Sequence, residues 1–175
     1  MHIFTVSLFG HRILRNPLAV EHALEKTVLN LLHENEFVEF LLGRNGDFDL
    51  LAASVIRRCR RSYGVDSSAM ILVLPYETAE YRNDLPALLK YYDEVEICEA
   101  AARMHFRAAM TARNREMVDR SDLIVGCVER QSGGAYQAIA YARTRGVVCV
   151  NLAEDETAAG CAPTENAKLK KDAQA

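Results

Sequence analysis

The chain has 175 residues, of which 50% are hydrophobic and 26% charged, a composition that suits one soluble domain with a sizeable core. Its formal net charge of -3 excludes a global basic field, and on that ground we expect nucleic acid to be an unlikely partner. No apolar run reaches the roughly 18 residues of a membrane span, and the N-terminus lacks the charged region of a signal peptide, so we expect a cytoplasmic protein.

The first part of the chain alternates apolar runs with amphipathic segments. Runs rich in β-branched and aromatic residues predict strands over residues 3–9, 37–42 and 69–74. Apolar residues at helical spacing predict helices between these strands, over residues 17–34 and from about 47 to 63. An asparagine and a proline stand where the first helix should begin, as N-cap and first-turn residue.

The middle of the chain interrupts this alternation. Residues 76–93 contain four tyrosines and a proline, and we interpret them as a long loop of the kind that often acts as a lid. Residues 95–97 predict a short edge strand, and a helix is expected from about 99 to 120.

The last third of the chain has the pattern of a βαβ unit. Residues 123–128 and 147–152 are apolar without in/out alternation, which is typical of parallel strands buried on both faces, and a helix is predicted between them. We therefore expect an α/β fold, with one Rossmann-like, doubly wound and mainly parallel sheet of about five strands flanked by helices. This domain covers residues 1–152, and the polar residues 153–175 are expected to form a disordered tail.

Ligands of such sheets bind beyond the carboxyl ends of the strands, where three loops of this chain carry glycine. Glycine amides at a helix start suit an anion, an arginine can grip a phosphate or carboxylate, and an aspartate can accept from a ribose hydroxyl or merely cap its helix. Ordinary turns and solvated side chains are the alternative. The candidate ligand-binding residues in these loops are Gly10, His11, Arg12, Gly43, Gly46, Asp49, Ser132, Gly133 and Gly134.

Two other groups of residues are interpreted as structural. Arg57, Arg58, Arg60 and Arg61 form a basic cluster that we interpret as a solvated helix end, because cations are favoured in the last turn of a helix. The five cysteines show no CxxC pairing, so we expect reduced, mostly structural thiols and no metal site.

Four motifs resemble the SLOG superfamily of Rossmann-like proteins, and in particular its YpsA-like branch. They are GHR after the first strand, GRNGDFDLLAA after the second, RNREMVDRSD before the strand at 123–128, and SGGAYQAIAYAR after it. The superfamily also includes LOG enzymes and the DNA-processing protein DprA. The resemblance implies a Rossmann-like sheet that binds nucleotides or molecules derived from them.

The match to the LOG enzymes is partial. Arg113 lies nine residues before Asp122, as does the ligand-contacting arginine of those enzymes, so the resemblance implies that Arg113 contacts ligand. A similar segment, Met104-His105-Phe106-Arg107, falls six residues too early. The position of the enzymes' glutamate falls on Ala138, or on Gln137 if the alignment shifts by one, so N-glycosidic hydrolysis is not expected.

We therefore predict a cytoplasmic, homo-oligomeric SLOG protein that senses a nucleotide-derived small molecule such as ADP-ribose, NAD or a nucleoside phosphate. One alternative is a nucleotide N-glycosidase of the LOG kind, which would need Asp47, Asp49, Glu116 or Glu129 as its carboxylate. The other is a protein-binding adaptor that uses the tyrosine-rich segment.

Overall fold

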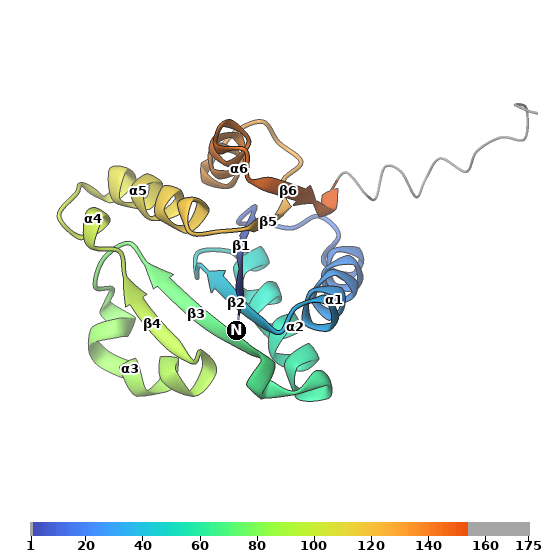
Figure 1. Cartoon of the computed structure of the whole chain (residues 1–175). Helices are drawn as coiled ribbons and strands as arrows, with labels where there is room; N and C mark the ends of the chain where they lie inside the picture. Colours follow the sequence, from blue (N-terminus) through green and yellow to red (C-terminus); the bar gives the residue numbers. More distant parts are fainter. Residues whose placement is uncertain (1, 154–175) are drawn as a thin grey trace, which may run out of the picture.

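The computed structural model describes residues 2–153, and in this part of the chain six parallel strands form one sheet (Figure 1). The strand order is β4-β3-β2-β1-β5-β6. The fold is thus α/β and Rossmann-like as predicted, with six strands in place of about five. The strands are β1 Ile3–Gly10, β2 Phe37–Leu42, β3 Ser68–Leu74, β4 Glu94–Ile97, β5 Leu123–Cys127 and β6 Val148–Asn151.

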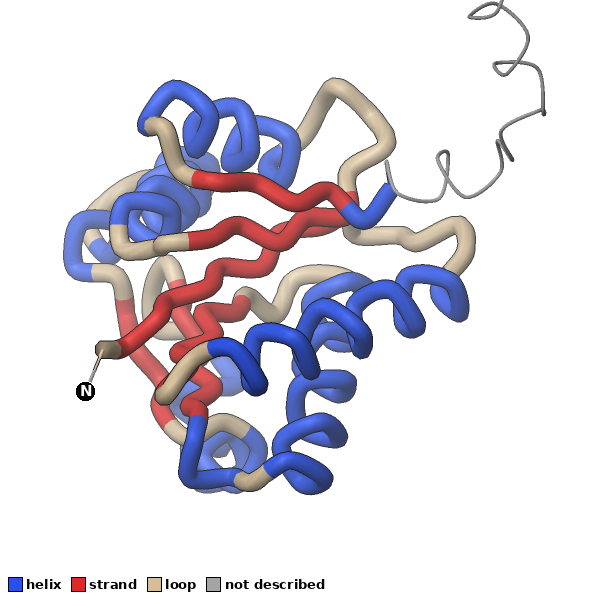
Figure 2. Tube along the Cα trace, turned by 45° about the vertical axis from the view of Figure 1, so that its right-hand side comes forward, coloured by secondary structure: helices blue, strands red, loops and turns tan. Residues whose placement is uncertain are grey.

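Helices cover both faces of this sheet (Figures 1 and 2). One face packs against α1 Pro17–Glu34, α2 Asp47–Tyr63 and α3 Ala79–Tyr91, with the short 3-10 helix η1 Val65–Ser67 before β3. The other face packs against α4 Glu99–Ala102, α5 Phe106–Asp119 and α6 Gly134–Arg145. The change of face follows from right-handed crossovers, because the chain winds from β1 toward β4 and then returns to the other side of β1.

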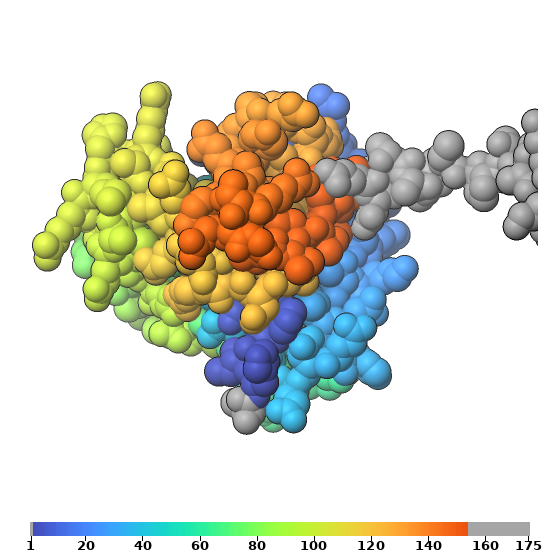
Figure 3. Space-filling model, turned by 45° about the horizontal axis from the view of Figure 1, so that its top comes forward, coloured from blue at the N-terminus to red at the C-terminus, as the bar shows by residue number. Residues whose placement is uncertain are grey.

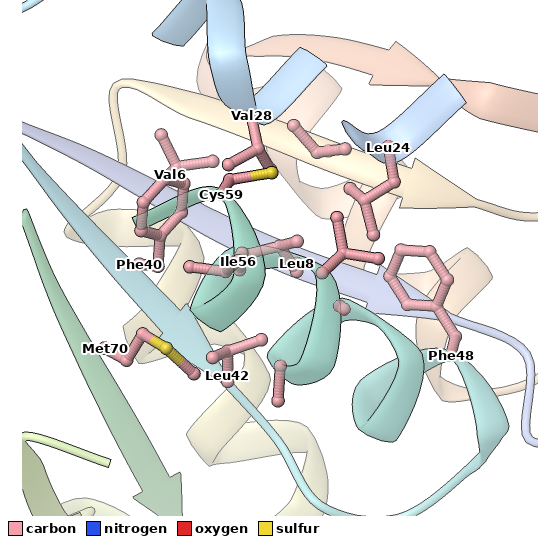
Figure 4. Packing of buried hydrophobic residues seen from close by; sticks show 14 of the residues in the cluster. Val6, Leu8, Leu24, Val28, Phe40, Leu42, Phe48, Ile56, Cys59 and Met70 are labelled. Carbon is pink, nitrogen blue, oxygen red and sulfur yellow. The ribbon is translucent and has the colours of Figure 1, made fainter. Parts of the chain in front are cut away.

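The larger of the two hydrophobic clusters lies under α1 and α2. Val6 and Leu8 project from β1 toward this side, and Leu24 of α1 and Ile56 of α2 meet them, all less than 2% exposed (Figure 4). Each such side chain contributes about 1.5–3 kcal/mol relative to an exposed one, so β1 is anchored at the centre of the core.

The predicted bounds of α1 and α2 agree with the structure because both helices have strong end signals. The Asn16 side chain accepts a hydrogen bond from the N–H of Ala19 at 3.4 Å, and Pro17 is the first helical residue. At its other end, α2 stops at Gly64, whose φ of 137° is one that L side chains rarely adopt.

The prediction of a loop over residues 76–93 is wrong, because most of this segment is α3. Its first turns are capped by Thr78, whose side chain accepts the N–H of Tyr81 at 3.1 Å. Asp84 leaves the helical region (φ -147°) and accepts the N–H of Ala87 at 3.2 Å, which starts a second short segment with Pro86 in its first turn. The proline therefore begins a helical segment instead of ending one.

The structure differs from three other expectations drawn from the sequence. The helix predicted over residues 99–120 is interrupted at residues 103–105, between α4 and α5. β5 is buried as predicted but β6 is not, because β6 is an edge strand and leaves Val148 64% exposed. Arg60 is not solvated but buried, and pairs with Asp93 at 2.7 Å.

The described part of the chain ends at residue 153, one residue after the predicted domain boundary. Of the predicted tail, residues 154–175 lie outside the described residues. Within residues 2–153, no helix is both long and apolar enough to span a bilayer.

Candidate functional site

The order of the strands reverses at β1, which pairs with β2 on one side and β5 on the other. Beyond the carboxyl ends of β1 and β5 the connecting chains leave toward opposite faces, so a crevice opens there. This switch point is where an open α/β sheet binds its ligand, and the loops after β1, β2 and β5 all reach it.

A cleft of about 370 Å³ occupies this switch point. All ten residues proposed from the sequence line it, including Arg113, which comes from α5. The structure therefore brings the proposed residues together, while their contacts with a ligand remain predictions. The lining residues that sequence reasoning missed are Asn45, Met110, Asn114, Arg130 and Ala135, with Leu8 and Phe9 at the floor.

Four of the missed residues had a detectable signal in the sequence. Met110 lies three residues before Arg113, and Asn114 lies four residues after Met110, so helical spacing places Met110 beside each of them on α5. Arg130 lies in the loop after β5, within the stretch where a ligand site was expected. Asn45 stands between the two glycines of the β2 loop.

The loop after β1 is locked to the start of α2. The N–H of Asp47 donates to the carbonyl of Arg12 at 2.9 Å, and the Asp47 carboxylate accepts the N–H of Leu14 at 3.4 Å. Gly46 allows this approach, because a Cβ there would lie 2.6 Å from the Cα of Arg12. Arg12 is thus held on a fixed backbone while its side chain is exposed to solvent.

His11 has a structural role that the sequence did not predict. Its Nε2 accepts the backbone N–H groups of both Glu129 and Arg130 at 3.0 Å, and the backbone N–H of His11 donates to the carbonyl of Cys127 at 3.2 Å. Burial, followed by the positive charge of Arg130, lowers the pKa of His11, so the neutral form that these bonds require is favoured. His11 therefore fixes the loop between β5 and α6.

Arg113 lies at the bottom of the cleft and is only 4% exposed. Its Nη1 donates to the carbonyl of Val73 at 3.3 Å, its Nε has no hydrogen-bond partner among the described residues, and no carboxylate in the described part of the chain forms an ion pair with it. Burial lowers the pKa of Arg113 and raises that of nearby Asp49. Both groups flank Gly43, where a Cβ would lie 2.7 Å from Arg113 Nη1 and 2.8 Å from Asp49 Oδ2.

The amino end of α6 completes the cleft. Gly133 precedes the helix with a φ of 91°, and no side chain caps the first turn. The first N–H groups of a helix have no partner within it, so those of α6 present a partial positive charge to the cleft. Arg12 and Arg130 are exposed beside it, and neither forms an ion pair with any residue between 2 and 153. These groups together suit a phosphate.

The carboxylates considered for catalysis are mostly outside the cleft. Asp49 alone of the four lines it, and its Oδ2 accepts the N–H of Asn45 at 2.8 Å. Glu129 pairs with Arg15 at 3.3 Å, and Glu116 accepts a hydrogen bond from Cys98 at 2.9 Å. Neither candidate position for the LOG glutamate carries a carboxylate, since they hold Gln137 and Ala138, and Ala138 is buried on the core side of α6. No group of metal-ligating side chains that could hold an ion occurs in residues 2–153.

No protein-family model and no curated protein sequence matches the chain. Solved structures do match. DNA processing protein A (DprA) from Streptococcus pneumoniae superposes with a TM-score of 0.59 at 15% identity, over 84% of this chain and 49% of that one. DprA from Helicobacter pylori superposes with a TM-score of 0.60 at 13% identity, over 90% of this chain and 73% of that one, and is described by its single-stranded DNA binding mode. The chain thus spans about half the length of the first protein.

These neighbours overturn two predictions. The sensor of a nucleotide-derived small molecule finds no support among them, nor do the N-glycosidase and the adaptor, and the expectation that nucleic acid is an unlikely partner is contradicted by a neighbour described by its single-stranded DNA binding mode. The expectation about nucleic acid rested on net charge, which averages over the whole molecule, whereas a nucleic acid responds to the local distribution of charge. DprA belongs to the SLOG superfamily, so the fold implied by the SLOG resemblance is confirmed, and the chain shares the Rossmann-like fold of DNA processing protein A.

Proposed function

We propose that this protein binds single-stranded DNA, with the phosphate backbone in the cleft at the carboxyl edge of the sheet. The observation that carries the proposal is the convergence of three arginines and the uncapped amino end of α6 on one cleft: Arg12 and Arg130 at its rim and Arg113 at its bottom. The fold shared with a protein described as binding single-stranded DNA supports it. We also infer that the chain belongs to the YpsA-like branch, on its GHR and SGG motifs.

The local charge of the cleft walls favours a polyanion. Residues 2–20, which form β1 and the loop behind it, contain no aspartate or glutamate. Residues 100–115, which form most of α5, contain four arginines and a histidine and again no acidic residue. Both segments contribute residues to the cleft, and Asp49 is the one acidic residue among the described residues that line it.

Each group has a distinct part in binding a phosphate. The exposed guanidinium groups of Arg12 and Arg130 release counterions from the backbone when they neutralise it. The α6 amides donate hydrogen bonds of fixed direction, because the bonds from His11 hold the loop that leads into α6. Arg113 supplies a buried charge whose hydrogen-bonding capacity is largely unused in the protein. Asp49 opposes it, and its raised pKa weakens that opposition.

The dimensions of the cleft favour one strand over two. Its volume of about 370 Å³ is that of a small-molecule site and accommodates a nucleotide or two, whereas a duplex cannot enter it. A single strand can lower one phosphate into the cleft and leave the neighbouring bases at the rim.

Fluorescence anisotropy with a labelled oligo(dT) of about 15 nucleotides tests the proposal. If roughly three phosphates are neutralised, the logarithm of the affinity should fall with the logarithm of salt concentration with a slope of about -2. Arg12→Ala and Arg130→Ala should each weaken binding by about 1–2 kcal/mol, or roughly 5- to 30-fold. Arg61→Ala is the matched control, because Arg61 is also exposed but lies in the last turn of α2, at the opposite edge of the sheet.

The outcomes separate clearly. Binding that is lost in the two cleft variants and kept in Arg61→Ala supports the proposed site. Equal losses in all three variants would mean that DNA responds to general charge and not to the cleft. Absence of binding at low salt would refute the function itself. The homo-oligomer and the cytoplasmic location remain predictions of the sequence.

A further inference from the structure

An exposed aromatic and basic corner lies where α4 gives way to α5. We call residues 103–107, with the sequence Arg-Met-His-Phe-Arg, the α4–α5 corner. All five residues are exposed, and Phe106 and Met104 leave 56% and 48% of their surface to solvent. This corner belongs to the yellow-green end of the molecule that stands out at the left in Figure 3. Its exposure has no explanation in the packing of the fold.

The corner is continuous with the cleft. Phe106, Met110 and Arg113 follow one another at intervals of four and three residues, so they lie along one face of α5. Met110 and Arg113 line the cleft, and Phe106 lies one turn, about 6 Å, farther out along the helix axis. A strand that leaves the cleft along α5 therefore meets Phe106 within one or two nucleotides.

A second ring extends the aromatic surface of Phe106. Tyr76 follows the carboxyl end of β3, and its ring centroid lies 6.2 Å from that of Phe106 with 54° between the ring planes. The tilted contact holds the Phe106 ring from one side while the residue remains more than half exposed. An aromatic ring that is held in place but open to solvent is a surface on which a nucleobase can stack.

Charge identifies the occupant of this corner. Arg103 and Arg107 flank the ring in sequence, and neither forms an ion pair with a residue in the described part of the chain. Glu99 precedes the corner in the sequence and Glu77 follows Tyr76, and both are exposed, while Glu80 pairs with Arg44 at 2.7 Å. An apolar protein partner would need a broader apolar surface than two side chains, whereas a ring between two free cations suits a base between two phosphates.

We propose that the α4–α5 corner is a base-stacking platform for single-stranded DNA, with one base on Phe106 and the adjoining phosphates on Arg103 and Arg107. The proposal rests on the proposed function, since the strand must first occupy the cleft. The corner then accounts for a preference for unpaired bases, because a base within a duplex has no free face to offer.

The test compares two probes and two matched variants of the full chain. The probes are a labelled oligo(dT) and an abasic oligonucleotide of the same length, which keeps the phosphates and lacks the bases. Phe106→Leu keeps an apolar side chain and removes the ring, and Tyr63→Leu does the same for an aromatic residue that is 45% exposed at the opposite edge of the sheet. Because both positions are exposed, both variants should melt like the parent protein.

The parent protein should bind oligo(dT) more tightly than the abasic probe. Phe106→Leu should weaken oligo(dT) binding by about 5- to 150-fold, which corresponds to the loss of one stacked base, and leave the abasic probe unaffected. Arg107→Ala should weaken both probes and make the salt slope shallower by about 0.7. Tyr63→Leu should change neither.

Failure of the proposed function can be distinguished from failure of the stacking platform alone. If the parent protein binds neither probe, the proposed function and the platform both fall. If the parent binds oligo(dT) and Phe106→Leu binds it equally well, the platform alone falls, and the corner then becomes a candidate surface for a protein partner. Equal affinity of the parent for the two probes would also overturn the platform, because no base would then contribute to binding.

Discussion

The imidazole of His11 accepts the backbone N–H of Arg130 at 3.0 Å, although the two residues are 119 positions apart in the chain. The same Nε2 also accepts the N–H of Glu129. This contact joins the loop after β1 to the loop after β5, across the point where the strand order reverses. A residue that the sequence suggested for ligand contact thus holds the two loops that form the cleft.

Folding stability should therefore depend on pH through His11. The pKa of His11 is lowered from 6.5 in the folded protein, chiefly by burial, so the unfolded state binds more protons below about pH 6.5. The contribution of His11 should be complete above pH 6.5 and should decrease as the pH falls toward the lowered pKa. At pH 7.5, His11→Ala should destabilise the fold by about 1–2 kcal/mol, because two hydrogen bonds are lost.

Urea unfolding at several pH values measures this effect. The difference in unfolding free energy between the parent and His11→Ala should shrink between pH 7 and pH 5. His22→Ala is the control, because His22 is exposed on α1 and is not part of the loop contact. A difference that stays constant over this pH range would show that the two bonds to Nε2 contribute little.

Gly46→Ala should destabilise the protein by about 1–3 kcal/mol, as expected when an extra methyl group displaces packed backbone. The added Cβ would lie 2.6 Å from the Cα of Arg12, and backbone at that position cannot move without breaking the bond from Asp47. Gly134→Ala is the matched control, since its Cβ would lie 3.6 Å from the nearest atom, in Asn114. Equal stability of the two variants in urea unfolding would show that the loop after β1 yields easily.

The sequence predicts the elements whose ends carry local signals. The bounds of α1, β2 and α2 agree with the structure, because the Asn16 cap and the glycines after β2 and α2 determine them locally. The segment that became α3 was mistaken for a loop because its signals were ambiguous. Pro86 indicates a break when it is considered alone, and only the cap at Asp84 shows that it starts a helical segment.

The sequence predicts which residues line the cleft, but it does not predict how these residues contact one another. Loops at the carboxyl ends of parallel strands must share one edge of the sheet, which is why the nine candidate residues in these loops line one cleft, while Arg113 reaches it from α5. The sequence could not predict that His11 faces a backbone loop, because its partners are 118 and 119 residues away. Nor does net charge indicate that residues 100–115, which carry no acid, lie beside the acid-free loop after β1.

Asp93→Ala should destabilise the fold although Asp93 is about half exposed. Its carboxylate accepts hydrogen bonds from Arg60 and from the N–H of Met70, both at 2.7 Å. Removal of the carboxylate would leave the buried Arg60 guanidinium with only carbonyl partners, at Val65 and Ser68. We expect a loss of about 2–3 kcal/mol, below the 3–5 typical of a fully buried pair because water can reach this side chain. Urea unfolding measures the loss, and an unchanged midpoint would mean that water replaces the carboxylate.

Arg113 provides the sharpest distinction between a structural and a functional charge. A structural buried arginine is normally paired, and its removal is costly, whereas Arg113 has one hydrogen bond of 3.3 Å to a carbonyl and a contact of 3.6 Å to the sulfur of Met117. Arg113→Met keeps a long side chain and removes the charge. The melting temperature should change little, because the desolvation cost of a cation without an ion pair is removed while the buried Asp49 carboxyl loses the opposite charge beside it.

The same substitution should weaken oligo(dT) binding by about 1.5–3 kcal/mol, or roughly 10- to 150-fold, if the buried charge meets a phosphate. At salt concentrations below physiological, this loss of affinity should exceed the loss caused by Arg61→Ala. The loss should also grow with pH as Asp49 ionises, because its raised pKa would rise further without the cation beside it. Thermal melting and anisotropy on one preparation measure both quantities. A large fall in melting temperature would make Arg113 a structural residue, and unchanged affinity would remove it from the DNA site and leave Arg12 and Arg130 to bind the backbone.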